Sequence, residues 1–214
     1  EVPLGGQAGA RAVVRALLGE VNPAGRLAET YPFSLDDTPT AGNFPETKQL
    51  ALYREGPFVG YRYYETANVP VRFPFGYGLS YATFTYSNLT ADETGVQFTV
   101  TNDSGVPGAT VAQLYVTGPS DGVLRPAREL KGFAKVQLDA HESKTVRIEF
   151  DRYTFRHFDT AANAWRTESG VWTLAVGTNA EDLPLTCEFA IAGDVDAIPA
   201  DPALGHYLTG DVKH

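Results

Sequence analysis

The sequence predicts a mainly β chain, in which an antiparallel β-sandwich follows the end of an α/β unit. Two observations carry this prediction. After Tyr81, apolar and polar residues alternate in several short runs, which is the pattern of strands with one buried face. Clusters of Asn, Asp, Ser and Gly separate these runs every ~8–12 residues, as turns do in an antiparallel sandwich. Before Tyr81 the chain shows a helical period and a long stretch without periodicity.

The composition indicates a folded chain and excludes two classes of partner. The 214 residues are 43% hydrophobic and 12% aromatic, which is enough for a packed core. No apolar run approaches the ~18–20 residues of a membrane-spanning helix, so we expect no membrane partner. The net charge of −9 argues against a nucleic-acid partner, because phosphate binding requires an excess of Lys and Arg. The chain contains no Met, so we expect it to be a piece of a longer product.

The first elements are a helix and an extended piece. Apolar residues recur three and four positions apart over residues 8–17, which predicts an amphipathic helix that Gly19 ends. Asn-Pro-Ala-Gly at residues 22–25 predicts a type I turn, and residues 26–31 are expected to be extended. One helix and one or two strands bury too little apolar surface to offset chain entropy. We therefore expect residues 1–82 to be the C-terminal part of a larger α/β domain.

A long loop and an aromatic segment complete this first part. Residues 33–58 lack periodicity and are rich in Pro, Thr, Asp and Gly, which is typical of a surface loop, often a functional one. Strand character returns at residues 58–64. The segment 73–81 combines Phe, Tyr and Gly, and Gly76 and Gly78 are expected to let the backbone turn under large rings.

The second part, residues 83–192, is expected to be the sandwich. Seven or eight short strands fit its length of about 110 residues, and the boundary is placed near residues 80–84. The alternating runs are residues 96–100, 112–116, 134–138, 146–150, 153–155, 172–176 and 185–191. From Gly193 the alternation stops and prolines appear, so residues 193–214 are expected to form a linker or an arm that wraps back over the molecule.

No residues are assigned to catalysis, to a cofactor or to a metal. No His has a nucleophile in a Gly-x-Ser-x-Gly turn, and no His, Cys or carboxylate spacing matches a metal site. His157 is expected to form a surface hydrogen bond, and Cys187 to be a buried apolar residue on a strand. The glycines at residues 5–9 and 76–78 lack the Lys-Ser/Thr and the helix context of phosphate-binding motifs, so tight turns are favoured.

The acidic side chains are expected to have structural rather than catalytic roles. Three acidic pairs lie in turn-like contexts, where capping and solvated roles are common: 36–37, 92–93 and 181–182. Glu55 lies in the long loop beside Arg54 and Arg62, so an ion pair or a backbone contact is favoured over catalysis. Trp165 and Trp172 are expected to lie on strands, and Trp172 to pack in the core rather than form a platform for sugars.

Three segments of the first part resemble the end of the α/β-sandwich domain of family 3 glycoside hydrolases. Residues 6–27 contain Asn-Pro-Ala-Gly-Arg-Leu, where the family has Asn-Pro-Ser-Gly-Arg-Leu. Residues 53–64 are similar to the family's Tyr-x-Glu-Gly-x-x-Val-Gly-Tyr-Arg-Tyr, and residues 73–81 to its Phe-Pro-Phe-Gly-x-Gly-Leu-Ser-Tyr. Ala24 and Ala28 replace the usual Ser and Pro, which are mild departures.

Two segments of the second part, residues 130–133 and 170–177, are similar to the immunoglobulin-like fibronectin type III-like domain that follows in this family. The resemblance implies a retaining β-glucosidase that uses two carboxylates and no cofactor. In the family, a barrel holds the nucleophilic Asp and the α/β sandwich holds the acid/base Glu ahead of the matching segments. The resemblance therefore implies that this chain alone is inactive, and that it completes the α/β domain and braces the barrel.

The expected partners are the remainder of its own enzyme and, in the intact enzyme, a β-glucoside or a related oligosaccharide. The loop at residues 33–58 is expected to approach the barrel. Three alternatives stay open: a carbohydrate-binding sandwich, a part of a β-xylosidase of the same family, and a purely structural scaffold. A permuted order, with the barrel after residue 214, and a homo-oligomer also stay open. The compartment is not determined, and a cytoplasmic location is favoured over secretion.

Overall fold

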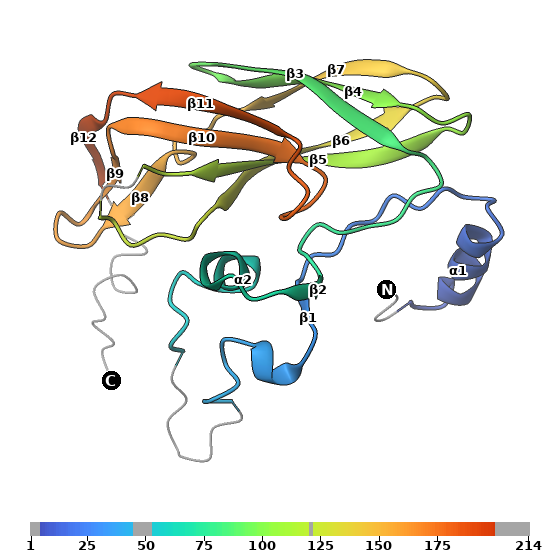
Figure 1. Cartoon of the computed structure of the whole chain (residues 1–214), viewed down its shortest axis with the longest axis horizontal. Coiled ribbons are helices and arrows are strands. Elements are labelled where there is room, and N and C mark those ends of the chain that lie inside the picture. The colour runs from blue at the N-terminus through green and yellow to red at the C-terminus, as the bar shows by residue number, and fades with distance from the viewer. Residues whose placement is uncertain (1–4, 45–52, 120–121, 200–214) are drawn as a thin grey trace.

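The computed structural model describes residues 5–44, 53–119 and 122–199, and for residues 194–199 it describes the backbone alone. An N-terminal segment runs along one side of a β-sandwich (Figure 1). The segment contains α1 (Gly9–Leu17), β1 (Tyr31–Pro32), a 3-10 helix (Leu35–Asp37), α2 (Tyr61–Ala67) and β2 (Val71–Phe73). No helix in the described part of the chain is long and apolar enough to cross a membrane.

Two antiparallel sheets make the sandwich, with the strand orders β11-β10-β5-β6 and β3-β4-β7. Alternate residues of each strand point inward, so Phe98 of β4, Leu114 of β5 and Leu174 of β10 share one buried core. The antiparallel immunoglobulin-like sandwich that the sequence predicts is thereby confirmed. Its strands are β3 (Phe84–Asp92), β4 (Gly95–Asn102), β5 (Gly108–Thr117), β6 (Glu129–Leu138), β7 (Ser143–Glu149), β10 (Gly170–Gly177) and β11 (Leu185–Ile191).

Trp172 lies in this core, as predicted. Its side chain is 4% exposed, and its Nε1 donates a hydrogen bond to the carbonyl oxygen of Glu168 at 3.2 Å. The ring of Phe155 packs edge-on against it at 5.4 Å between centroids and stacks on Phe189 at 5.9 Å. A buried indole with its one donor satisfied serves packing, so it is not available as a sugar platform.

A third, smaller sheet has the order β12-β9-β8, formed by β8 (Arg156–Asp159), β9 (Ala164–Thr167) and β12 (Asp194–Pro199). The predicted strand at residues 153–155 is wrong, because Thr154 closes a turn there. Its Oγ1 accepts a hydrogen bond from the backbone N–H of Asp151 and donates one to Asp151 Oδ1. β12 falls in the expected linker or arm, most of which lies outside the described residues.

The strand expected at residues 58–64 is also wrong, since the chain forms the helix α2 from Tyr61 onward. Gly60 has a φ of +58°, which turns the chain out of an extended course, and Asn68 ends the helix in the left-handed region. The helical period places Tyr61 and Tyr64 on one side, where they pack inward. Aromatic residues favour strands in isolation, but burial against neighbours decides their structure.

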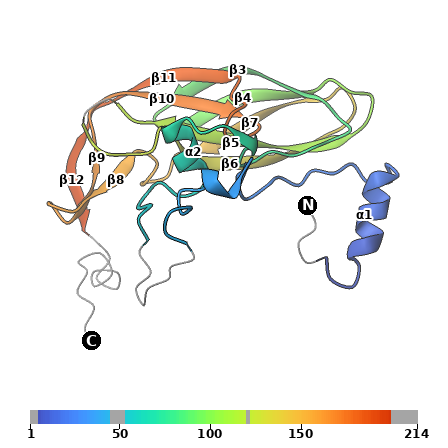
Figure 2. The same ribbon diagram turned by 60° about the horizontal axis from the view of Figure 1, so that its bottom comes forward.

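The helix α1 confirms the amphipathic period of residues 8–17, and Gly19 follows it at a φ of +74°. The type I turn expected at residues 22–25 is not formed, and residues 22–27 contain no turn or bend. Figures 1 and 2 show α1, the 3-10 helix and α2 on the same side of the sandwich. The N-terminal segment is therefore held by the sandwich on one side and open on the other.

Candidate functional site

Asn22 joins the N-terminal segment to the sandwich at the point where a local turn was expected. Its Nδ2 donates a hydrogen bond to the carbonyl oxygen of Pro107 at 2.9 Å. Its Oδ1 accepts hydrogen bonds from Ser80 Oγ and from the backbone N–H of Tyr81, each at 2.9 Å. A Cβ atom at Gly108 would lie 2.8 Å from Asn22 Nδ2, so glycine is needed beside this contact. One amide thus connects three segments.

Arg26 forms a second, more buried connection. Its Nη2 donates to Thr110 Oγ1 at 2.8 Å and its Nη1 donates to the carbonyl oxygen of Gly78 at 3.3 Å. The hydroxyl of Tyr86 lies 3.0 Å from the same Thr110 oxygen. Burial lowers the pKa of Arg26, since desolvation disfavours its charged form. A Cβ atom at Gly78 would lie 2.5 Å from the oxygen of Gly25, so the two backbones meet closely.

The aromatic-glycine segment turns at Gly76, as the sequence predicts. Gly76 has a φ of +84°, and any side chain there would collide with Gln113 of β5. Gln113 Nε2 donates to the carbonyl oxygen of Thr178 at 2.7 Å, and Gln113 Oε1 accepts a hydrogen bond from the hydroxyl of Tyr115 at 2.7 Å. Burial raises the pKa of Tyr115. Gly76 and Gly78 therefore both serve close packing.

The helix α2 is attached to the start of β6 by backbone contacts. The hydroxyl of Tyr61 accepts a hydrogen bond from the backbone N–H of Leu130 at 2.7 Å. Thr66 Oγ1 accepts one from the N–H of Ala127 at 2.9 Å. The partners are separated by 69 and 61 residues, so nothing local in the sequence could have paired them.

Ion pairs add to the same attachment. Arg62 lies 3.3 Å from Glu129, and Glu65 lies 3.1 Å from Arg128. Arg128 Nη1 also donates to the carbonyl oxygen of Ala180 at 2.9 Å. Burial raises the pKa of Glu65, because desolvation outweighs the opposing effect of Arg128. The side chain of Glu65 is only 13% exposed. This pair therefore lies inside the junction, by which we mean the contacts that Asn22, Arg26 and α2 make with the sandwich.

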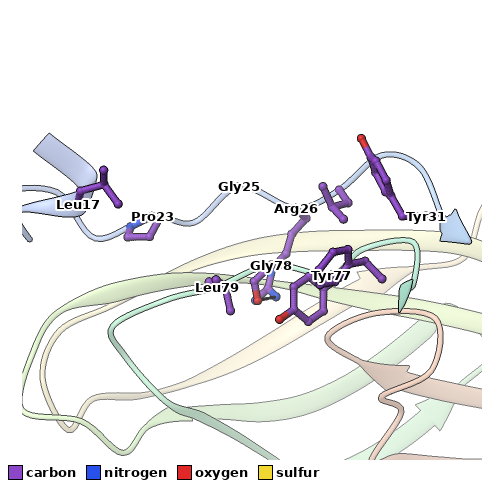
Figure 3. Close-up of a pocket in the computed structure, with 10 residues that line it drawn as sticks. Leu17, Pro23, Gly25, Arg26, Tyr31, Tyr77, Gly78 and Leu79 are labelled. Carbon is purple, nitrogen blue, oxygen red and sulfur yellow. Dashed lines mark hydrogen bonds between the residues drawn. The ribbon is translucent and has the colours of Figure 1, made fainter. Parts of the chain in front are cut away.

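An apolar groove opens beside the junction (Figure 3). It has a volume of about 660 Å³ and lies between the stretch that follows α1 and the aromatic-glycine segment. Helix α1 buries none of its residues, and Leu17, Leu18 and Leu79 are 74%, 71% and 70% exposed. An amphipathic helix without a partner for its apolar face indicates a surface that another part of a protein covers. The groove is lined by Leu17, Pro23, Gly25, Arg26, Leu27, Tyr31, Phe73, Tyr77, Gly78 and Leu79.

The long loop exposes apolar side chains as well. We define the loop surface by the large apolar residues that are most exposed in the described part of the loop and at position 59, directly after it. Glu55 lies in the same loop, and its Oε2 is buried without a hydrogen-bond partner. The ion pair expected for Glu55 is not formed among the described residues, and Arg62 pairs with Glu129 instead. The loop surface consists of Phe33 (65% exposed), Leu35 (81%), Phe44 (75%), Tyr53 (91%) and Val59 (58%).

The remaining residues singled out in the sequence have structural roles. His157 Nε2 lies 3.7 Å from Glu168 Oε1. Cys187 lies on β11, half-buried against the core, and burial raises the pKa of its thiol. Gly6 forms a turn, its oxygen accepting a hydrogen bond from the N–H of Gly9 at 3.3 Å. Across the described ranges, no group of three His, Cys, Asp or Glu side chains could hold a metal ion.

The acidic pairs act in turns and caps, as expected. Asp37 accepts a hydrogen bond from the backbone N–H of Ser34 and caps the 3-10 helix. Asp92 accepts one from the N–H of Thr94, and hydrogen bonds from Arg147 and Thr94 lower the pKa of Asp92. Asp37 and Asp92 are thus held by hydrogen bonds, and Asp92 is also bound by Arg147 of β7.

Comparisons with known proteins match both parts of the chain. Residues 1–81 match the model of the glycosyl hydrolase family 3 C-terminal domain, and residues 110–180 match that of a fibronectin type III-like domain. An exo-α-(1→6)-L-arabinopyranosidase of Bifidobacterium breve is 43% identical over 88% of this chain and 26% of its own length. Thermostable β-glucosidase B of Acetivibrio thermocellus is 42% identical over 86% of this chain and 26% of its own length.

The fold agrees with these matches. The crystal structure of a Bifidobacterium adolescentis family 3 β-glucosidase superposes with a TM-score of 0.84 at 40% identity, over 92% of this chain and 30% of that one. The chain thus spans about a quarter of the length of the curated relatives it matches. It belongs to glycoside hydrolase family 3, and it carries the C-terminal domain of that family followed by a fibronectin type III-like domain.

Proposed function

We propose that this chain is the non-catalytic C-terminal segment of a retaining β-glucosidase that hydrolyses terminal non-reducing β-D-glucosyl residues. The segment completes the α/β domain and braces the catalytic barrel, and the two catalytic carboxylates are supplied by the rest of the enzyme. The exposed apolar face of α1 and the groove beside it carry this proposal. Such a surface is buried in a stable protein, and in relatives of about four times this length the additional sequence is available to cover it.

The bracing role is supported by the junction. Asn22, Arg26 and α2 each make side-chain contacts to the sandwich. The sandwich is therefore not connected to the N-terminal segment by a flexible linker alone. Its contacts fix the position of the open groove. A β-sandwich held in this way would restrict the motion of the part of the enzyme that packs in the groove.

A second candidate substrate is favoured by two of the relatives. The Bifidobacterium breve protein is named an exo-α-(1→6)-L-arabinopyranosidase and is as similar to this chain as the β-glucosidases are. The same segment would then serve an arabinopyranosidase. A binding module for polysaccharide is less well supported, because Trp172 is buried in the core.

The proposal is tested by assays on p-nitrophenyl β-D-glucopyranoside and p-nitrophenyl α-L-arabinopyranoside. We expect this chain alone to be inactive, the full-length product of its gene to be active, and deletion of residues 1–214 to abolish that activity. Hydrolysis by the chain alone at the full-length rate, or full activity after the deletion, would contradict the proposal. The ratio of the two activities identifies the substrate.

A further inference from the structure

A second cleft lies between the stretch that follows α1 and the sandwich. It has a volume of about 740 Å³, and its walls are formed by residues 19–24 on one side and by the first residues of β5 and the end of β6 on the other. We call it the β6 cleft. It shares no lining residue with the apolar groove of Figure 3. Its volume lies within the range of small-molecule sites, roughly 300–1,000 Å³.

The walls of the β6 cleft are fixed before any ligand arrives. The hydrogen bond from Asn22 Nδ2 to the carbonyl oxygen of Pro107, at 2.9 Å, joins one wall to the other. At the base of the cleft, a Cβ atom at Gly108 would lie 2.8 Å from Cβ of Ala82, so the backbones there are closely packed. A site that is already formed binds with a smaller loss of conformational entropy.

Tyr81 places an aromatic ring in this cleft. Its hydroxyl donates a hydrogen bond to the carbonyl oxygen of Ala16 at 2.8 Å, and its backbone N–H donates to Asn22 Oδ1 at 2.9 Å. The residue is nevertheless 54% exposed. The ring is thus held at both ends and keeps an open surface, on which the C–H groups of a flat, partly apolar ligand can pack.

Two polar side chains of β6 complete the cleft. Lys135 and Gln137 alternate along the strand with Val136 and Leu138, which point into the core, so both polar side chains point to the outer face. Both line the cleft and are exposed. Neither side chain forms a hydrogen bond or an ion pair with the residues that the structure describes. An ammonium group and an amide together offer donors and an acceptor to a ligand.

The charges around the cleft favour a ligand that is polar and carries no net charge. Glu20 lines the wall opposite Lys135, so both signs are present, and Glu20 pairs with Arg15 at 3.1 Å. The net charge of −9 disfavours a polyanion. A neutral sugar combines apolar C–H faces, which suit Tyr81, with hydroxyls that both donate and accept hydrogen bonds.

We propose that the β6 cleft is an auxiliary binding site for a neutral oligosaccharide. Tyr81 is the stacking platform, and Lys135 and Gln137 bind sugar hydroxyls. The choice of a gluco-oligosaccharide as the ligand rests on the proposed function. The buried Trp172 does not bear on this site, because the cleft is built by the junction of the two parts of the chain and not by the core of the sandwich.

Photoaffinity labelling of the full-length protein tests the site. The probe is a thio-linked cellotetraose with a diazirine at its reducing end, which resists hydrolysis. We expect labelled peptides from residues 19–24 and 133–137, and we expect an excess of thio-linked cellotetraose without the diazirine to prevent this labelling. Label that is found only outside this chain, or label in the cleft that the competitor does not reduce, would overturn the proposal.

Variants of the full-length protein identify the residues. Tyr81→Leu should reduce labelling of the cleft by about fivefold, because the ring contact is lost. A double variant, Lys135→Ala with Gln137→Ala, should reduce it by about threefold. The double variant changes only exposed side chains, so it tests the site even where Tyr81→Leu disturbs folding. Gln97→Ala is the control, since Gln97 is exposed on the other sheet. Equal labelling in the double variant and the control would overturn the proposal.

The same experiment separates this inference from the proposed function. Labelling does not require hydrolysis, so a full-length protein that is labelled in the cleft but does not hydrolyse p-nitrophenyl β-D-glucopyranoside would contradict the proposed function alone. A protein that hydrolyses this substrate and takes no label in the cleft would contradict the auxiliary site alone.

Discussion

The side chain of Asn22 accepts a hydrogen bond from the backbone N–H of Tyr81, a residue 59 positions away, at 2.9 Å. The same amide donates to the carbonyl oxygen of Pro107. The stretch after α1, the end of the aromatic-glycine segment and the turn before β5 therefore meet at one residue. This contact explains why the N-terminal segment keeps a fixed course along the sandwich although it contains little regular structure.

We predict that Asn22→Ala destabilises the chain by about 2 kcal/mol, because three hydrogen bonds worth about 0.5–1.5 kcal/mol each are lost. Differential scanning calorimetry of the chain measures the effect. Gln7→Ala is the control, since Gln7 is exposed in the turn before α1. The importance of Asn22 would be refuted if both variants unfolded at the temperature of the unchanged chain.

Gly78→Ala is expected to destabilise the chain by about 1–3 kcal/mol, the usual effect of forcing an extra atom into a packed site. The new Cβ atom would lie 2.5 Å from the oxygen of Gly25 and 2.8 Å from Cδ of Arg26. Gly105→Ala is the matched control, because its Cβ would meet nothing closer than His141 Nε2 at 3.9 Å. Urea denaturation measures the free energy of unfolding of both variants. Equal values would show that the backbones at Gly25 and Gly78 can move apart without loss of stability.

Glu65 gives a prediction about pH. Its pKa is raised by burial in the folded chain, so the folded state binds the proton more tightly than the unfolded state. The stability of the chain relative to Glu65→Gln is therefore greatest below the ordinary pKa of a carboxyl. It declines as the pH rises through the raised value. Denaturation midpoints of both proteins across acid and neutral pH measure this difference.

Asp92 provides the opposite case and serves as the control. Hydrogen bonds from Arg147 and Thr94 lower its pKa, so its contribution is present above the ordinary pKa of a carboxyl and is lost as the pH falls. The stability difference from Asp92→Asn is thus expected to grow as the pH rises from acid. Parallel pH profiles for the Glu65 and Asp92 variants would contradict both assignments.

Substitutions on β10 are expected to destabilise the chain only on the face of the strand that points into the core. Leu174→Ala removes a fully buried side chain and should destabilise the chain by about 2–5 kcal/mol. Val171, on the same strand, is 53% exposed, and Val171→Ala should change stability by no more than about 0.5 kcal/mol. Tryptophan fluorescence in urea follows both. A similar loss in both variants would mean that the outer face of β10 is covered too.

The sequence predicted the sandwich well because its strands alternate cleanly. Val96, Phe98 and Val100 all point into the core, as their spacing requires. The strand β3 was harder to recognise, because Asn88 has a φ of +56° and the register shifts between Ser87 and Thr90. A bulge of this kind breaks the alternation of apolar and polar residues that marks a strand in a sequence.

The junction could not be predicted, because its contacts join residues far apart in the chain. Asn22 looked like the start of a turn, and only the fold brings Tyr81 and Pro107 to it. The segment at residues 58–64 carried strand-forming residues, yet contacts such as that from Tyr61 to Leu130 hold it as a helix. Glu55 was expected to form an ion pair or a backbone contact, and among the described residues the ion pair is not formed, since Arg62 pairs with Glu129 of the sandwich.

We expect the apolar face of α1 to be covered, in the full-length protein, by polypeptide outside this chain. Hydrogen–deuterium exchange of residues 9–18 tests it most directly, in this chain alone and in the full-length protein. We expect rapid exchange in the chain alone and strong protection in the full-length protein. Equally rapid exchange in both would contradict it.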